Sequence, residues 1–422
     1  MNNASPLAQA RALRDQGRHR EAYACLQQLS WPSGNLEPYL LRGVLERHLG
    51  LHREAESSLA LALGHPPHHG LACYELGELQ RSLGRFDAAA GWFLAALRHA
   101  PDHPWIHHSL QFTRYSPALL PLVEAEYARH ASAHPADAMG LHLLAEVQLR
   151  LERKAEAIAT ARRAARLQLG ERASWLAPAE AEPTPPDFLI IGVPKGGTTS
   201  LLHWLGQHPQ LWAHPRKELH FFNGAWEQGP AWYAAQFPVF QAGSGILRGE
   251  ATPNYFHHPL APARVAAAAP QARLILLLRD PLERAISWIE HLRRHEGLQG
   301  STEALLLAEL EQKETGTRAL RDSCYDSALA HWREQCANPL LVLRSEELFT
   351  QPEPTLARCA AFLGVNPSAT PAALNPQNVN PQPRSALSQA ALERLHAHLA
   401  EHNRCLWAER HNNSGQDRQQ RL

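Results

Sequence analysis

Residues 192–200, GVPKGGTTS, combine the residue types that a phosphate-binding loop needs. Gly196 and Gly197 let the backbone curl so that successive N–H groups point to one place. Thr198 and Thr199 add hydroxyl donors at the start of a predicted helix, where the helix dipole favours an anion. The stretch therefore predicts a loop that holds a phosphate group.

Lys195 stands three residues before the position at which a nucleotide hydrolase has its lysine. In the G-x-x-x-x-G-K-[ST] loop, the spacing from Gly192 would place that lysine at residue 198. Asp280 ends another apolar run and keeps a magnesium–nucleoside triphosphate site open as an interpretation, but Arg279 directly before it puts a cation where a metal ion would bind. A P-loop kinase or nucleotide hydrolase is therefore the alternative, and a different phosphate-bearing donor is favoured.

Short apolar runs alternate with helical patterns in the second part of the chain, and they must position this loop. Residues 187–193, 272–280 and 339–348 are bounded runs of the kind that is buried in a parallel sheet. Helical patterns lie between them and begin near Thr199 and Pro281. The alternation predicts an α/β domain whose functional loops follow the carboxyl ends of its strands.

The first part of the chain repeats itself. A glycine is followed five residues later by a small residue three times, and prolines fall 34 residues apart just beyond helical patterns. The glycines are Gly17, Gly50 and Gly84, the small residues Ala22, Ala55 and Ala89, and the prolines Pro67, Pro101 and Pro135. The glycine ends one helix, the small residue permits close approach of the next, and the proline closes the unit. The pattern resembles tetratricopeptide repeats, of which about four or five would stack into a solenoid.

Two further units are less regular. A weaker copy has Ala157 at the small position, and the unit around 115–134 has neither the glycine nor a clear small residue. An Ala/Leu-rich helical bundle with chance spacing is the alternative.

The prolines of APAEAEPTPP then mark a linker, because no helix interior tolerates them. The predicted parts are an all-α tetratricopeptide-like helical repeat domain at 1–175, a linker at 176–186, an α/β domain at 187–410 and a polar tail at 411–422.

The composition argues against several classes of protein. Lys+Arg and Asp+Glu both total 41, so the net charge gives no sign of a nucleic-acid partner. The apolar runs are too short for a membrane span, and the N-terminus lacks the apolar core of a signal peptide. The six cysteines include no C-x-x-C pair. The 26 histidines show no spacing typical of metal ligands, and HPPHH at 65–69 is typical of a polar turn. With scarce lysine and abundant arginine and alanine, these features lead us to expect a bacterial cytoplasmic protein without a metal.

Several motifs resemble those of sulfotransferases that use 3′-phosphoadenosine-5′-phosphosulfate (PAPS). PKGGTTS after a strand is similar to that family's loop for the 5′-phosphosulfate, and RDPLERAIS to its motif for the 3′-phosphate. KELHFFNG (217–224), GEATPNYF (249–256) and YDSALAHWREQ (325–335) resemble segments of the heparan-sulfate-type enzymes in the same order. The resemblance covers about residues 187–410 and implies a P-loop-like parallel-sheet sulfotransferase domain.

The resemblance implies how the donor is held. Sulfuryl transfer is an in-line displacement with charge developing on the leaving oxygen, so Lys195 would act at the bridge between phosphate and sulfate. Loop amides and hydroxyls would hold the 5′-phosphate, and a guanidinium and a hydroxyl eight residues apart would hold the 3′-phosphate, with no metal required. The residues implied are Gly196, Gly197, Thr198 and Thr199 for the first phosphate and Arg279 and Ser287 for the second.

Glu218 is the implied catalytic base. It matches the acidic residue of the E-x-x-F-F segment that removes the acceptor proton in the resembling enzymes, and His220 matches a neighbour that assists. The alternative for Glu218 is a structural carboxylate paired with Lys217 or Arg216. Glu250 is a second carboxylate, which we expect to brace the site.

The acceptor is less determined than the donor. Where the family commonly has a lysine after the second carboxylate, this chain has Ala251, so either Lys217 substitutes for it or the acceptor differs. Arg384 falls where relatives have a basic loop closing over the donor. We expect a hydroxyl or amine acceptor, with carbohydrate favoured over peptide tyrosine or a small molecule. The repeat domain is suited to a protein or peptide partner, and a repeat-based scaffold with an inactive sulfotransferase domain is a further alternative.

Overall fold

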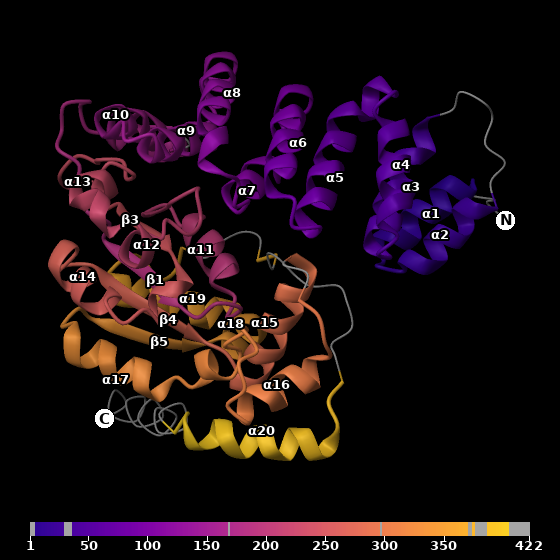
Figure 1. The fold of residues 1–422 in the computed structure, drawn as a ribbon. Helices are drawn as coiled ribbons and strands as arrows, with labels where there is room; N and C mark the ends of the chain where they lie inside the picture. The colour runs from indigo at the N-terminus through magenta and orange to yellow at the C-terminus, as the bar shows by residue number, and fades with distance from the viewer. Residues whose placement is uncertain are drawn as a thin grey trace. The chain divides into compact units, whose positions relative to one another are not determined.

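A computed structural model of the chain describes residues 5–28, 36–167, 169–295, 298–369, 374–375 and 386–404. Arg384 and the predicted tail at 411–422 fall outside the described residues. The chain forms two compact units: most of the first is Met1–Ala157, and the second begins at Ile158. The first unit is helical, and the second contains a sheet (Figure 1).

The helical unit consists of successive antiparallel helix pairs, drawn from indigo to magenta in Figure 1. Its α-helices are α1 (Pro6–Asp15), α2 (His19–Gln27), α3 (Glu37–His48), α4 (His52–Ala62), α5 (His69–Ser82), α6 (Phe86–His99), α7 (Ile106–Gln111), α8 (Leu120–Ala133) and α9 (Ala138–Arg150), and α10 (Lys154–Ala165) continues into the second unit. Two short 3-10 helices lie between them, η1 (Pro66–His68) and η2 (Pro117–Leu119).

The repeat pattern shapes these pairs as the sequence predicts. Gly17, Gly50 and Gly84 adopt the left-handed conformation, with φ of 75°, 77° and 73°, between the two helices of a pair. Glycine adopts this conformation without steric cost, which is why it ends helices. In the weaker copy the same position is occupied by Glu152, with φ 62°, five residues before the fully buried Ala157. The backbone turn is therefore kept although the glycine is not.

The second unit contains five strands and the remaining helices. The strands are β1 (Phe188–Gly192), β2 (Leu211–Ala213), β3 (Leu247–Ala251), β4 (Arg273–Leu278) and β5 (Leu340–Arg344). The α-helices are α11 (Thr198–Gly206), α12 (Phe221–Gly224), α13 (Gly229–Ala234), α14 (Ala261–Ala268), α15 (Pro281–His295), α16 (Thr302–Leu310), α17 (Asp326–Gln335), α18 (Ser345–Thr350), α19 (Pro352–Leu363) and α20 (Gln389–Glu401). The 3-10 helices are η3 (Gly170–Trp175), η4 (Trp226–Gln228), η5 (Pro253–Tyr255) and η6 (Arg321–Ser323).

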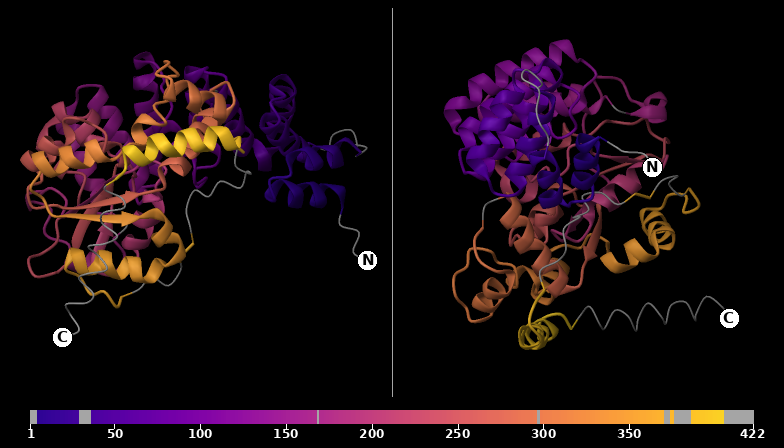
Figure 2. Two further views of the ribbon diagram at one scale, coloured as in Figure 1. Left: turned by 90° about the horizontal axis from the view of Figure 1, so that it is seen from below. Right: turned by 90° about the vertical axis from the view of Figure 1, so that its right-hand side faces the viewer.

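The five strands form one parallel sheet in the order β2-β3-β1-β4-β5. The three predicted apolar runs are β1, β4 and β5, and the predicted α/β class is confirmed. β1 and β4 are buried almost throughout, because helices lie on both faces of the sheet (Figure 2). On one face, side chains of β1 and β4 pack with those of α11 and α19 in a hydrophobic core that includes Phe188, Ile190, Leu201, Ile275 and Leu363.

Strand order defines where a ligand can bind. From β1 the chain passes to β2 and β3 on one side, and from β4 it passes to β5 on the other. The loops that follow β1 and β4 therefore diverge, and in open α/β sheets the crevice at such a point holds the ligand. Both predicted donor motifs follow these two strands.

The segment predicted as a linker is held by hydrogen bonds. Arg162 Nη2 donates to the carbonyls of Ala179 and Ala181, at 2.6 and 3.0 Å. Arg248 donates to the carbonyls of Thr184 and Pro185, at 3.3 and 3.0 Å. Its proline-rich backbone is therefore anchored within the second unit. Among the residues described, no helix is both long enough and apolar enough to cross a membrane.

Candidate active site

Glycine is required at two positions of the loop after β1, for a different structural reason at each. Gly197 has φ 91° and precedes α11, a conformation that other residues adopt only with strain. Gly196 lies against the backbone, since a Cβ there would be 2.8 Å from the carbonyl oxygen of Leu277 and 2.9 Å from that of Val193. The loop therefore turns tightly against β4 and leads into the N-terminus of α11, where the helix dipole favours an anion.

Lys195 and Arg279 join the two predicted donor motifs. Arg279 Nη1 donates to the backbone carbonyl of Lys195 at 3.1 Å, across the divergence point between β1 and β4. Its other terminal nitrogen is 3.4 Å from Glu283, and Tyr325 donates its hydroxyl to the Arg279 carbonyl at 3.0 Å. Burial lowers the pKa of Arg279 from its ordinary value. A partly desolvated guanidinium of this kind is suited to a phosphate.

Ser287 lies on the same face of α15 as Glu283, the residue that contacts Arg279. It follows Glu283 by four residues in α15, so the two side chains are one turn apart on one face. Glu283 is the residue that contacts Arg279, and Ser287 is half-buried. Glu283 therefore lies between the two residues in the helix pattern: it contacts Arg279 and is one turn before Ser287.

Asp280 has a structural role at the start of this helix. Its Oδ1 accepts the N–H of Glu283 at 3.0 Å, as an N-cap residue does. Its own N–H donates to Glu346 Oε1 at 2.7 Å. The carboxylate that kept the nucleoside-triphosphate interpretation open therefore caps α15.

The segment that carries Glu218 is attached to the end of β3. The Glu218 N–H donates to the Ala251 carbonyl at 3.1 Å. This segment therefore lies at the carboxyl ends of the parallel strands, next to the loop that follows β1. Glu218 and His220 have φ of 67° and 53°. Left-handed conformations in residues other than glycine cost about 1–3 kcal/mol and are concentrated at functional sites. The local backbone therefore needs support from its surroundings.

Glu218 contacts two polar side chains, one through each carboxylate oxygen. One carboxylate oxygen contacts Lys217 Nζ, and the other lies 3.4 Å from His220 Nε2. Burial alone would raise the pKa of Glu218, but the charge of Lys217 and the hydrogen bond from His220 outweigh it and lower the pKa to about 2. Glu218 is 18% exposed, so the ionised carboxylate remains accessible to a ligand.

Glu250 has opposite surroundings. It is fully buried, and its oxygens accept hydroxyl groups from Tyr233 at 3.1 Å, Tyr255 at 2.8 Å and Thr252 at 2.7 Å. Burial raises the pKa of Glu250, and the three hydroxyl donors oppose that shift. Its carboxylate is enclosed by protein groups and has no access to an acceptor.

The same hydroxyls hold the segment of Glu218. Tyr255 accepts the N–H of Phe221 at 3.0 Å, and Thr252 accepts the N–H of His220 at 3.4 Å. Glu250 thus orients two hydroxyls, and each of them fixes one backbone amide beside the left-handed residues. This is the bracing role expected for Glu250.

The comparisons with known proteins agree with this geometry. The family model described as Sulfotransferase domain matches residues 185–395, which is half of the chain. The chain belongs to the sulfotransferase family. A second model, Tetratricopeptide repeat, matches residues 72–104 in the helical unit and confirms the predicted repeats.

Relatives of the sulfotransferase domain include enzymes of heparan sulfate. The Bifunctional heparan sulfate N-deacetylase/N-sulfotransferase 1 of Xenopus tropicalis is 34% identical over 195 residues, 43% of this chain and 22% of that protein. The Heparan sulfate glucosamine 3-O-sulfotransferase 6 of Homo sapiens is 35% identical over 182 residues, 43% of this chain and 52% of the relative. This chain thus spans about a fifth of the length of the first relative and about half of the second. The structure of a sulfotransferase from Alicyclobacillus acidocaldarius covers 54% of this chain and 96% of its own, with 26% identity and a TM-score of 0.44.

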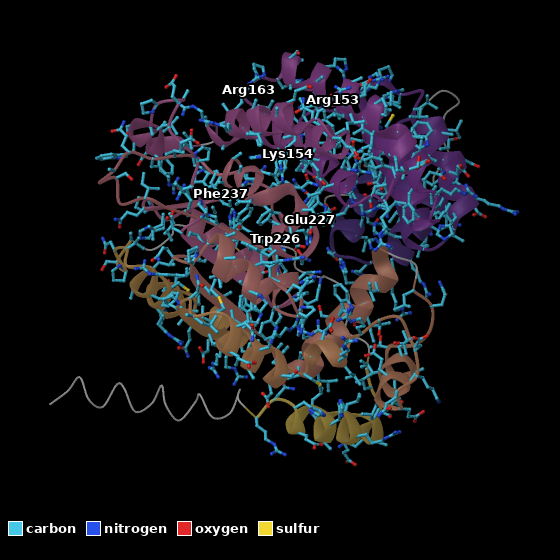
Figure 3. All side chains as sticks on the ribbon, turned by 60° about the vertical axis from the view of Figure 1, so that its left-hand side comes forward. Arg153, Lys154, Arg163, Trp226, Glu227 and Phe237 are labelled. Atoms are coloured by element: carbon cyan, nitrogen blue, oxygen red, sulfur yellow. The ribbon has the colours of Figure 1, made fainter. Side chains whose placement is uncertain are left out.

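An aromatic cluster lies behind the segment of Glu218 in the sulfotransferase domain. Phe221 stacks on Tyr233 with ring centres 4.3 Å apart, and Phe237 contacts Tyr233 at 5.3 Å. Trp226 contacts Phe221 at 5.5 Å and has the guanidinium of Arg264 over its ring; Trp226 and Phe237 are labelled in Figure 3. Such pairs add packing energy beyond their buried area, so the cluster fixes the residues that follow His220.

Ala251, where the family commonly has a lysine, belongs to the hydrophobic core of the sulfotransferase domain. It is fully buried and is the β-sheet neighbour of Ile190. The cation beside Glu218 is instead Lys217. This contact is the pairing with Lys217 that the alternative interpretation of Glu218 named.

Several supporting residues of the site carried no assigned role in the sequence. Thr252 and Tyr255 lie within the motif GEATPNYF, and Tyr325 within YDSALAHWREQ. Membership of these motifs was the feature of the sequence that could have marked them as site residues. Tyr233 and Glu346 lie outside those motifs, and no pattern in the sequence marks them. Their partners come from other strands and helices, so tertiary structure was needed to find them.

Proposed function

We propose that the protein transfers the sulfuryl group of PAPS to a hydroxyl or amine acceptor, with a carbohydrate favoured. The observation that carries the proposal is the hydrogen bond from Arg279 to the Lys195 carbonyl, which joins the two donor motifs at the divergence point of the sheet. The heparan sulfate relatives support a carbohydrate acceptor.

The donor would bind along the loop and the start of α15. The amide of Gly197 and the hydroxyls of Thr198 and Thr199 would hold the 5′-phosphate at the beginning of α11, where the helix dipole favours an anion. The N–H of Gly196, which the sequence also suggested, donates instead to the Val193 carbonyl at 2.9 Å within the loop. The contact of Arg279 with Glu283 is long at 3.4 Å. The guanidinium of Arg279 and the hydroxyl of Ser287 would both donate hydrogen bonds to the 3′-phosphate. Two fixed phosphate sites would orient the sulfuryl group for in-line attack.

Lys195 would act on the leaving group. As the sulfur–oxygen bond to the phosphate breaks, negative charge grows on the bridging oxygen, and a cation there stabilises the transition state. The acceptor oxygen or nitrogen forms the new bond to sulfur, its proton passes to Glu218, and adenosine 3′,5′-bisphosphate leaves.

Glu218 would become a stronger base when the acceptor is bound. Its pKa of about 2 depends chiefly on Lys217 and His220, since burial acts in the opposite direction. An acceptor or sulfonate group that draws Lys217 away leaves burial dominant, and the pKa of the carboxylate then rises. Lys217 would thereby take the place of the cation that relatives have at residue 251.

Ligand-induced thermal shift tests the donor site. We expect adenosine 3′,5′-bisphosphate to raise the melting temperature of wild type and to have little effect on Lys195→Ala and Arg279→Ala, with Lys313→Ala, on the exposed surface of the same unit, as the matched control. Ligand binding to the folded state alone raises stability. Stabilisation by ATP–magnesium and not by the bisphosphate would instead favour the nucleotide hydrolase.

Transfer from labelled PAPS to a panel of acceptors tests the reaction. We expect a product with at least one glycan and its loss in Lys195→Ala. Donor binding without transfer to any glycan, tyrosine peptide or small hydroxyl or amine compound would indicate the scaffold with an inactive domain.

A further inference from the structure

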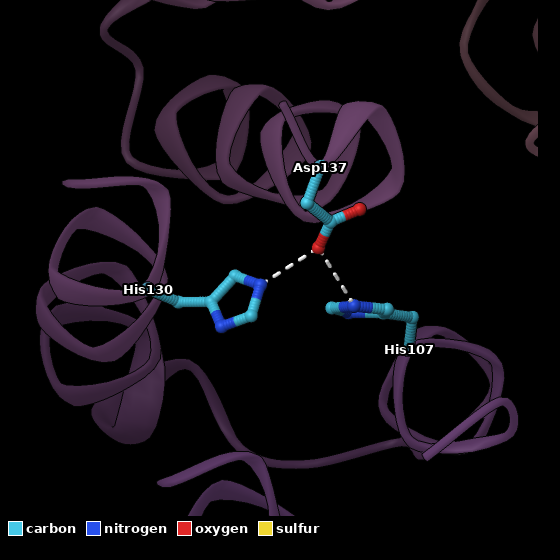
Figure 4. A group of neighbouring side chains, drawn as sticks. All are labelled: His107, His130 and Asp137. Atoms are coloured by element: carbon cyan, nitrogen blue, oxygen red, sulfur yellow. Dashed lines mark hydrogen bonds and ion pairs between the residues drawn. The ribbon is translucent and has the colours of Figure 1, made fainter. Parts of the chain in front are cut away.

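Three side chains of the helical unit place their ligand atoms together. Among the residues described, His107, His130 and Asp137 are the group of histidine, cysteine and acidic side chains whose possible metal-binding atoms all lie within 4.8 Å of one another. Figure 4 shows that the two imidazoles and the carboxylate point toward one another from three different helices. The cluster has no part in the sulfotransferase site.

One carboxylate oxygen is shared by both imidazoles. His130 Nε2 lies 2.7 Å and His107 Nε2 lies 3.0 Å from Asp137 Oδ2. The other oxygen of Asp137 accepts the N–H of Met139 at 3.0 Å and caps α9. His130 is almost completely buried, and His107 is 12% exposed. The capping contact fixes the carboxylate, so that Oδ2 stays directed at the two rings.

The surroundings of the cluster are those of a metal site. The second nitrogen of His107, Nδ1, lies 3.2 Å from the hydroxyl of the buried Tyr127, and such outer partners fix the orientation of ligating histidines. Residue 140 is glycine, and a Cβ there would lie 2.6 Å from Asp137 Oδ2 and 3.2 Å from His130 Nε2. A side chain at residue 140 would therefore occupy the space beside the ligand atoms of Asp137 and His130.

We propose that His107, His130 and Asp137 bind a divalent transition-metal ion, for which zinc is the best match. Two imidazole nitrogens and one carboxylate oxygen are a ligand set that zinc takes, with a fourth position for water. Around a tetrahedral zinc ion with bonds of about 2.0–2.2 Å, ligand atoms lie roughly 3.3 Å apart. A bound ion would therefore widen the 2.7 Å separation of His130 Nε2 and Asp137 Oδ2 by about 0.6 Å and the 3.0 Å separation of His107 Nε2 and Asp137 Oδ2 by about 0.3 Å.

The metal would stabilise the least regular part of the repeat domain. Its ligands come from α7, α8 and the residue that caps α9, and the unit around 115–134 is the one that lacks the glycine and the small residue. α7 is also only six residues long. A metal bonded to three helices would replace packing that the other repeats obtain from their regular pattern.

The expectation of a protein without a metal rested on ligand spacing along the sequence. The three ligands are spread over residues 107–137 and resemble no compact metal motif. Without a metal, the same three side chains form a hydrogen-bonded His–Asp–His network that joins the helices. An experiment must therefore distinguish metal binding from this network.

Zinc titration of the chelator-treated full chain gives the first measurement. We expect calorimetry to show one tightly bound equivalent in wild type that is weakened on the order of 100-fold or more in His130→Gln and in Asp137→Asn. His108→Gln is the matched control, because His108 is the exposed neighbour of His107 on α7. This control is expected to keep the wild-type equivalent, which separates the site from weak binding by other histidines.

Two further measurements do not depend on ligand variants that could unfold. Co²⁺ added to wild type is expected to give the intense visible absorption of a tetrahedral nitrogen–oxygen site, and Zn²⁺ is expected to abolish it. Tyr127→Phe removes the outer partner of His107 and is expected to weaken zinc binding by about tenfold. Absence of the Co²⁺ spectrum in wild type, or equal zinc binding by wild type and a folded Asp137→Asn, would overturn the proposal in favour of the metal-free network.

Discussion

Glu218 and Glu250 both lie at the carboxyl end of β3, yet their surroundings give them different properties. Glu218 is partly exposed between Lys217 and His220, and its pKa is lowered to about 2. Glu250 is enclosed by three hydroxyl groups, and burial raises its pKa. The residue type is the same, so neighbouring charge and burial decide which carboxylate is available for chemistry and which one holds the backbone.

The comparison also shows how the two carboxylates depend on each other. Glu218 and His220 have positive φ angles. The hydroxyl of Thr252 accepts the N–H of His220, and the hydroxyl of Tyr255 accepts the N–H of Phe221. Those hydroxyls are in turn oriented by Glu250. A strained reactive segment is therefore supported by a rigid buried network, as preorganised sites require.

The largest expected effect comes from Glu218→Gln. We expect sulfuryl transfer from PAPS to slow by roughly 10²–10⁴-fold, the range for loss of a general base. Stability in urea at neutral pH should also fall, because the lowered pKa of Glu218 means that its ionised form stabilises the folded chain. Full turnover in this variant would show that Glu218 is not the base and would end the proposed division of roles.

Glu250→Gln should lower the stability of the folded chain by removing an acceptor of its buried hydroxyl groups. An amide cannot accept all three hydroxyl donors as a carboxylate does, so we expect a loss of about 1–3 kcal/mol in the free energy of unfolding. Turnover should fall by roughly tenfold through displacement of the Glu218 segment. Urea unfolding and kcat measure the two effects, and Glu311→Gln, an exposed carboxylate, serves as the control. A large loss of turnover with unchanged stability would assign Glu250 to the chemistry instead.

Lys217→Met should move the acid limb of activity upward in pH. The wild-type carboxylate has a pKa of about 2, so it stays ionised as the pH falls through the mildly acidic range. Without the Lys217 charge, burial dominates, and the pKa of Glu218 rises toward or above its ordinary 4.5. The base form is then lost at a higher pH. The pH dependence of kcat/KM, which reports the enzyme without bound acceptor, measures the shift, and an unchanged profile would contradict the electrostatic role of Lys217.

The same depressed pKa predicts a stability effect with a defined sign. A carboxylate whose folded-state pKa lies below its unfolded value contributes stability that is complete above about pH 4.5 and is lost as the pH falls toward 2. Acid titration of unfolding should therefore show a smaller loss of stability in this window for Lys217→Met than for wild type.

The smallest expected effect is that of Thr252→Val. This change removes one hydroxyl donor to Glu250 and the acceptor for the His220 amide, whose contact is long at 3.4 Å. We expect a loss of about 1 kcal/mol in stability and a decrease of a few fold in turnover. Thermal unfolding and kcat test it. A loss as large as that of Glu218→Gln would place Thr252 directly at the reaction.

The repeats and the donor motifs could be predicted because each depends on local sequence. Gly17, Gly50 and Gly84 have left-handed backbones that glycine signals directly. Glu152 repeats that conformation without the signal, and so the fourth turn was harder to identify. The predicted strands β1, β4 and β5 are continuous apolar runs buried in the parallel sheet.

β3 was not predicted because its sequence, LRGEA, is polar for a buried strand. Arg248 is compensated there by Asp187, with Nε and Oδ2 2.9 Å apart, and Glu250 by its three hydroxyls. Asp187 and Tyr233 come from elsewhere in the chain, and Thr252 and Tyr255 directly follow the strand. With two charged residues compensated in this way, the apolar pattern that marks a buried strand is absent.

The sequence by itself determined the repeat domain, the α/β class and the family, because short motifs and periodic spacing carry that information locally. The tertiary structure decided which carboxylate is exposed and charged, how Arg279 reaches the loop of Lys195, and that His107, His130 and Asp137 meet. Each of these depends on atoms brought together from different elements. Burial and neighbouring charge, which set the chemistry of a side chain, are therefore properties of the folded chain.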